Sequence, residues 1–194
     1  EEDDYYLRFE GLNSRDGTGS WTECAKPGIP KTLTNMPLVI QRTAITNPGT
    51  VNEVATFTIK QFTYADRLIG DELTNPLPSF VNKRINKVLF FRNRLVFLSG
   101  ENVITSRPGT LGEPDFFSES ALTISSSDPI DISAASTFPS ELFDGIAINT
   151  GLVVFSTNQQ FLLASDDTVL NPDTAKLRSI STFNYNKDIA PISL

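Results

Sequence analysis

Short apolar runs recur along almost the whole of this chain and limit what it can fold into. They are rich in Val, Ile, Phe and Thr, and clusters of Gly, Pro, Asn, Asp and Ser separate them. Runs of this kind, spaced about 8 to 12 residues apart, predict β-strands and are typical of sandwiches, barrels and propellers. Helical periodicity is scarce, and only residues 79–85 indicate a short helix. We therefore expect an all-β fold.

The apolar runs give the positions of the expected strands. In chain order they cover residues 5–9, 21–25, 38–42, 55–61, 87–91, 95–99, 103–106, 121–124, 130–134, 145–148, 152–156 and 160–164. Most neighbours are joined by short polar segments, which favours antiparallel hairpins and meanders over parallel crossovers.

The second half of the chain contains an internal repeat. Residues 88–106 align with residues from 145 onward at an offset of 57 residues, which places Leu95 on Leu152 and Ser99 on Ser156. Both copies alternate strands with short polar turns. Repeated antiparallel meanders of this kind are how propeller blades appear in sequence. The alternative is a β-sandwich built from two similar hairpins.

Two prolines within residues 73–78 discourage both a helix and a central strand there, so we place a domain boundary in this segment. We expect a small antiparallel β subdomain over residues 1–75 and propeller-like repeats over 76–194. The blade-like units would lie at about 85–125 and 129–165, with a third one opening near Asp188 and truncated at the C-terminus. Because the chain starts without Met and stops in mid-pattern at Leu194, we expect a fragment of a longer protein.

Composition excludes several classes of function. The chain has no histidine and a single cysteine, Cys24, so common catalytic triads and zinc sites cannot form. A net charge of −7 argues against general affinity for nucleic acid. No apolar run approaches the roughly 20 residues that span a bilayer, so we predict no membrane insertion. We expect no catalytic residue, no cofactor and no metal, and hence not an enzyme.

One basic cluster could contradict that view. Lys83, Arg84, Lys87, Arg92 and Arg94 lie close together with no acidic residue between them. They could form a nucleic-acid patch or a subunit contact. We favour a third interpretation, in which long basic side chains flank a turn and protect the edges of a sheet.

Two further motifs resemble ligand sites without matching one. Asp166, Asp167, Asn171 and Asp173 could offer oxygen ligands to Ca²⁺, but their spacing is not that of an EF-hand loop. We interpret this segment as a solvated loop.

The second motif is a glycine pair. Gly17 and Gly19 superficially resemble a phosphate loop, yet no Walker lysine follows, and a hairpin turn explains them better. A pair of carboxylates for glycoside hydrolysis stays possible among so many acids, although Trp21 is the only tryptophan available as a sugar platform.

The charge is distributed unevenly along the chain. Residues 1–100 carry a net charge of +1 and residues 101–194 one of −8. An acidic surface ordinarily serves solubility. It would also suit a channel through which DNA must pass without binding.

Several sequence runs resemble a known family. They are YADRLIGDELTNPLPSF at 64–80, INKVLFFRNRLVFLSGENVITSR at 85–107 and SSDPIDISAAS at 126–136, preceded by DYYLRFEG near the start. In this order they are similar to the tail nozzle protein (tail tubular protein B) family of short-tailed bacteriophages. Tyr64 departs from the family pattern, which has Trp there.

The resemblance implies a structural protein of the virion tail, made in the host bacterial cytoplasm. It implies a hexameric ring with propeller-like β domains at the distal end of the tail, continuing the DNA-ejection channel. An adaptor ring of tail proteins and the tail fibres would be its partners, and genomic DNA would pass through without specific binding. No catalytic residue carries over. The alternative function is a virion β module that binds or hydrolyses glycans.

Overall fold

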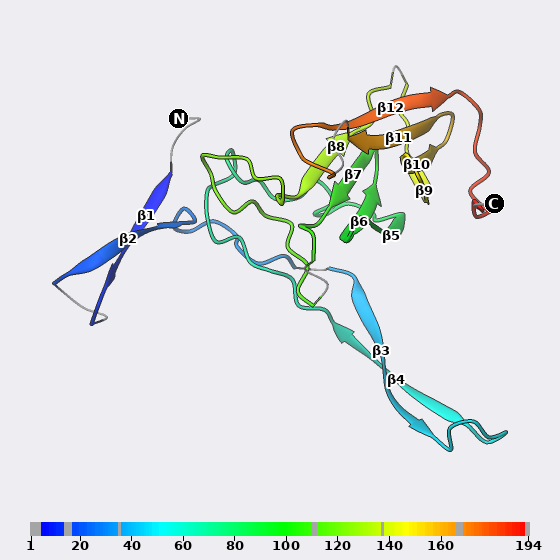
Figure 1. The fold of residues 1–194 in the computed structure, drawn as a ribbon, viewed down its shortest axis with the longest axis horizontal. Coiled ribbons are helices and arrows are strands. Elements are labelled where there is room, and N and C mark those ends of the chain that lie inside the picture. The colour runs from blue at the N-terminus through cyan, green and yellow to red at the C-terminus, as the bar shows by residue number, and fades with distance from the viewer. Residues whose placement is uncertain are drawn as a thin grey trace.

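The described part of the chain is entirely β-structure and loop. The computed structural model describes residues 5–13, 17–34, 36–109, 112–136, 138–165 and 169–192, and these contain no helix. The strands, labelled in Figure 1, are β1 (Tyr6–Gly11), β2 (Gly19–Cys24), β3 (Leu38–Thr46), β4 (Val54–Gln61), β5 (Lys87–Phe91), β6 (Arg94–Ser99), β7 (Asn102–Thr105), β8 (Ile130–Ser133), β9 (Leu142–Ile148), β10 (Gly151–Ser156), β11 (Gln160–Ser165) and β12 (Ala175–Ser181).

Two four-stranded antiparallel sheets form the body of the molecule. Each is a meander in which every strand pairs with its neighbour in the chain: β5-β6-β7-β8 is the first sheet and β9-β10-β11-β12 the second. A two-residue turn joins β5 to β6, and its residues Arg92 and Asn93 both have positive φ, 47° and 61°. This is the type I′ geometry that matches the twist of a hairpin. The all-β, antiparallel expectation is confirmed.

The two sheets pack face to face over a shared core. The first sheet contributes Val96, Leu98 and Val103, and the second contributes Leu152 and Phe161, all at most 1% exposed. Strands β5 and β9 approach closely, because Gly145 has no side chain. A Cβ atom there would lie 2.8 Å from Leu89 Cδ1.

The other face of the first sheet is covered by a second core, made largely with loops. Phe97 and Ile104 point into it, where Phe97 stacks on Phe116 with ring centroids 5.1 Å apart. Leu33 and Tyr64 belong to the same cluster. These two side chains of the N-terminal third therefore join the core of the first sheet.

Two hairpins project from this body. Figure 1 shows β1–β2 at one end of the molecule and the longer β3–β4 at the other. The hairpin turn expected around Gly17 and Gly19 is confirmed by the pairing of β1 with β2. Gly19 is required there, since a Cβ atom would lie 2.3 Å from the Glu10 carbonyl oxygen.

Two expected elements are absent from the described residues. Residues 121–124 form no strand, because the Ser120 hydroxyl accepts the Leu122 amide in a local turn while Leu122 and Ile124 stay exposed. The expected helix over 79–85 is instead two successive turns, closed by the Val81 amide on Pro78 and the Lys83 amide on Phe80. The positive φ of Asn82, 60°, ends any helical path there.

The limits of the repeats also differ from the expected ones. The fourth strand of the first sheet is β8, which the sequence grouping placed in the second unit. The fourth strand of the second sheet is β12, which the sequence analysis missed. A third unit was expected to open near Asp188. Residues 188–192 form no strand, and residues 193 and 194 lie outside the described part.

Candidate interaction surface

The β3–β4 hairpin has one apolar and one polar face. Ile40 pairs with Ile59, and Arg42 pairs with Phe57, so these side chains lie together on one face. We define the β3–β4 apolar face as Leu38, Ile40, Ile45, Phe57 and Ile59, all of them exposed. On the opposite face the Thr58 hydroxyl donates to that of Thr43 at 3.5 Å.

The β1–β2 hairpin is built in the same way. Leu7 pairs with Glu23, and Phe9 pairs with Trp21, whose ring it meets edge to face at 5.4 Å between centroids. We define the β1–β2 apolar face as Leu7, Phe9 and Trp21, all exposed. Arg8 and Glu10 occupy the polar face and pair with each other at 2.6 Å.

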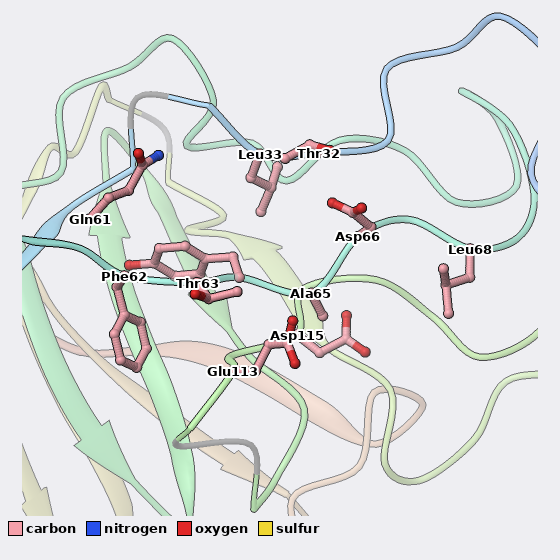
Figure 2. Close-up of a pocket in the computed structure, with 11 residues that line it drawn as sticks. Thr32, Leu33, Gln61, Phe62, Thr63, Ala65, Asp66, Leu68, Glu113 and Asp115 are labelled. Atoms are coloured by element: carbon pink, nitrogen blue, oxygen red, sulfur yellow. The ribbon is translucent and has the colours of Figure 1, made fainter.

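A cavity of about 680 Å³ lies at the root of the β3–β4 hairpin (Figure 2). The segment that leaves β4, the segment that precedes β3 and the loop around Pro114 enclose it, joined by a hydrogen bond from the Ala65 amide to the Pro114 carbonyl. Its lining includes three carboxylates and two aromatic residues: Asp66, Glu113, Asp115, Phe62 and Tyr64.

These residues do not make a glycan site of the kind anticipated. Asp115 is already engaged, since it pairs with Arg107 at 3.2 Å and accepts the Phe117 amide at 2.9 Å. Tyr64 is buried in the second core, and its hydroxyl donates to the Pro37 carbonyl. A sugar ring needs an exposed aromatic face, which Tyr64 does not offer. The cavity is best described as an acidic recess beneath a hairpin.

An apolar groove of about 390 Å³ opens beside this cavity. Leu38 and Val39 at the start of β3 form one wall, and Val88 and Leu95 of the first sheet form the other. Since Leu38 also belongs to the β3–β4 apolar face, exposed apolar surface continues from the hairpin onto the body of the molecule.

The structure disperses the basic cluster. Arg94 is 2% exposed, and burial lowers the pKa of its guanidinium. Lys87 pairs with Asp144 at 2.8 Å across the two sheets. Arg92 lies in the β5–β6 turn over the Phe91 ring, while Lys83 and Arg84 are exposed. The turn interpretation holds for Arg92. It is wrong for Arg94, whose buried side chain protects no sheet edge.

The acidic segment that was interpreted as a solvated loop is only partly described. Asp166 and Asp167 lie outside the described residues. Asn171 and Asp173 form a local turn, in which the Asp173 amide donates to the Asn171 side chain at 3.0 Å. Across the described residues, no group of three or more His, Cys, Asp or Glu side chains could hold a metal ion.

Three acidic residues of the second half accept hydrogen bonds that stabilise loops. Asp131 accepts hydrogen bonds from Ser79 and Asn102, and Asp128 accepts the amides of Glu119 and Ser125. Glu101 accepts the Ser140 amide in the same way. Part of the negative charge is therefore explained by the loops that these carboxylates hold.

Sequence reasoning missed two buried arginines that organise the loops. Arg94 donates to four carbonyl oxygens, and Arg67, which is 0% exposed, donates to Pro30 and to Asn75. An arginine in a turn-rich segment looks like an exposed residue in a single sequence, so nothing in the pattern signalled either one.

A capped turn follows Arg67 and meets the β1–β2 hairpin. Hydrogen bonds from the Thr74 and Leu73 amides lower the pKa of the Asp71 carboxyl. The Tyr6 hydroxyl donates to the same carboxylate at 3.4 Å, and Ala25 forms a parallel bridge with Gly70. This turn therefore anchors the hairpin to the body.

Comparisons with known proteins identify relatives of this chain. The family described as Bacteriophage nozzle protein matches residues 1–194. A protein of Escherichia phage T7, tail tubular protein gp12, is 31% identical over 194 residues. That alignment covers 99% of this chain and 22% of the phage protein, so the chain spans about a fifth of that relative's length. Among the described residues, no helix is long and apolar enough to cross a membrane.

Proposed function

Because this chain belongs to the bacteriophage nozzle protein family, we propose that it is part of a ring that forms the distal DNA-ejection channel of a phage tail. The family match over residues 1–194 carries this proposal. The protein is then a structural component of the virion tail, and its role depends on the geometry of the assembly rather than on catalysis.

We further propose that the two sheets are neighbouring propeller blades, at residues 87–133 and 142–181. The first strands β5 and β9 contact each other, and so do the last strands β8 and β12. Strands at the same position in the two sheets therefore contact each other. Neighbouring propeller blades are arranged in this way, because a rotation about the propeller axis superimposes one blade on the next.

The direction of equivalent side chains supports the same proposal. Leu152 points into the core between the sheets, whereas Leu95, its equivalent in the repeat, packs in the second core on the far side of the first sheet. Val154 and Phe97 differ in the same way. In a sandwich of two sheets related by a twofold axis, equivalent residues would meet in the shared core. Here the face of the second sheet that enters the shared core corresponds to the face of the first sheet that points away from it, as in successive propeller blades.

The proposed assembly is a hexameric ring. An adaptor ring of tail proteins and the tail fibres are its proposed partners, and genomic DNA passes through without specific binding. A net charge of −7, the burial of Arg94 and the pairing of Lys87 with Asp144 support passage without binding, since these leave fewer positive groups to hold phosphates.

Native mass spectrometry of the full-length protein tests this function. A closed hexamer is the expected result. A monomer or a trimer at concentrations well above those in an infected cell would contradict the ring.

The alternative of a glycan module is tested separately, by measuring whether the protein releases reducing sugar from host surface polysaccharide and whether Asp66→Asn abolishes that release. No release is the result we expect.

A further inference from the structure

The two apolar hairpin faces have no cover within the described chain. Ile59 is 64% exposed, and Trp21 is 66% exposed. A two-stranded hairpin alone is at best marginally stable in water, and contiguous exposed apolar patches mark sites of association. Each hairpin therefore needs a partner to hold its apolar side chains.

The hairpins cannot cover each other within one subunit. Figure 1 shows them at opposite ends of the molecule, with loops between them and both sheets to one side. Closed rings of identical subunits are made by heterologous contacts, in which one surface of a subunit meets a different surface of its neighbour. Two different apolar faces at opposite ends satisfy that condition.

The charges of the two hairpins are complementary. Strands β3 and β4 contain Arg42 and Lys60 and no acidic residue. In β1 and β2, Arg8 and Glu10 neutralise each other on the polar face, which leaves Glu23 as the uncompensated charge. Glu23 lies beside Leu7, and Arg42 lies beside Phe57, so each apolar face carries a charge opposite to that of the other. One oxygen of Glu23 also accepts the Ala121 amide, which fixes the position of this carboxylate.

We propose that the β3–β4 apolar face of one subunit packs on the β1–β2 apolar face of a second copy of this chain. The contact repeats around the ring from head to tail, with Arg42 approaching Glu23 of the neighbouring copy. This inference rests on the proposed ring, and it assigns the surfaces through which neighbouring subunits meet.

Cysteine cross-linking in the full-length protein tests the contact. The variant carries Cys24→Ser to remove the cysteine of this region, with Leu7→Cys on one hairpin and Ile59→Cys on the other. Both sites are exposed, at 46% and 64%, so the substitutions leave the fold intact. A short bis-maleimide should give a ladder of covalent oligomers that ends at the size of the ring. The matched control places Thr22→Cys and Thr58→Cys on the polar faces of the same two hairpins, and it should give no ladder.

A second pair of variants probes the same contact without cross-linking. Phe57→Asp with Ile59→Asp should weaken assembly at least about tenfold, because two charges enter an apolar contact. Thr56→Asp with Thr58→Asp, on the opposite face of the same strand, should assemble like the wild type.

The outcomes separate this inference from the ring itself. If the unmodified protein forms no ring, both proposals fail. If the ring forms and the apolar cysteine pair gives no ladder, this contact alone is wrong. A monomer band shifted by an internal link would likewise overturn it, since the face would then be covered by its own subunit.

Discussion

Arg94 Nη2 donates a hydrogen bond to the carbonyl oxygen of Leu170, 3.1 Å away, and so joins the first sheet to the loop between β11 and β12. The same guanidinium reaches the carbonyls of Ser106, Ser126 and Asp128 at 2.7 to 2.9 Å. A single buried cation thus holds two loops, the β7–β8 connection and the β11–β12 loop, and its hydrogen bonds replace the water it has lost.

Replacing Arg94 should destabilise both sheets together. In Arg94→Met four carbonyl groups lose their donor, three of them in buried contacts, and we expect a loss of about 3 kcal/mol in the free energy of unfolding. Urea unfolding followed by circular dichroism measures it. Arg84→Met is the control, because Arg84 is exposed, and it should change stability little. Equal stability of the two variants would contradict the role assigned to Arg94.

Leu152 fills the core between the sheets and is 1% exposed. Leu152→Ala should cost about 3 kcal/mol through lost burial and the cavity left behind. Leu152→Asp should abolish folding, since an unpaired charge would be buried. Leu122→Ala, at an exposed loop position, is the matched control, and thermal melts of the variants give the comparison. A cooperative melt of Leu152→Asp near the wild-type temperature would argue against this core.

Gly70 occupies a conformation that other residues rarely adopt. Its φ is +71°, and a Cβ atom there would lie 2.8 Å from Asn75 Cβ. Gly70→Ala should therefore lower stability by about 2 kcal/mol. Gly112→Ala should be nearly neutral, because a Cβ atom at Gly112 meets nothing within 4 Å. The urea midpoints of the two variants test this prediction, and equal midpoints would contradict it.

The turn at Asp71 should make stability depend on pH in the acid range. Its pKa is lowered in the folded state from the usual 3.8, so its contribution is fully present above that value. The contribution disappears as the pH falls through the lowered pKa, where the folded carboxylate becomes protonated. Unfolding free energies measured from about pH 6 to about pH 2 should show this loss, and Asp71→Asn should reduce it. An identical pH profile for the two proteins would show that other carboxylates cause the acid loss.

The local pattern of the sequence predicted much of the fold. Alternating apolar residues located β5, β6 and β10 nearly to the residue, because burial on one face of a sheet imposes a period of two. β12 was missed because, of its seven residues, only Leu177 is buried, and its remaining positions read as polar loop. Residues 121–124 gave the opposite error, since an apolar run does not show whether a partner strand is available.

The interaction surface was less predictable. Leu7, Phe9 and Trp21 could be placed on one face of a hairpin from alternation alone. Whether such a face packs on the core or stays exposed depends on where the hairpin leaves the body. That position is set by contacts between loops that are far apart in the chain. The role of Arg94 depends in the same way on carbonyl groups as distant as Leu170, and no local pattern records them.

The meander order of the two sheets has a consequence for how the protein is made. Every strand of the body pairs with strands next to it in the chain, so each hairpin can form as soon as its second strand has left the ribosome. The first sheet is complete at Ser133, before the second begins at Leu142. Folding can thus advance from one sheet to the next during synthesis, and the second sheet can pack against a first sheet that has already formed.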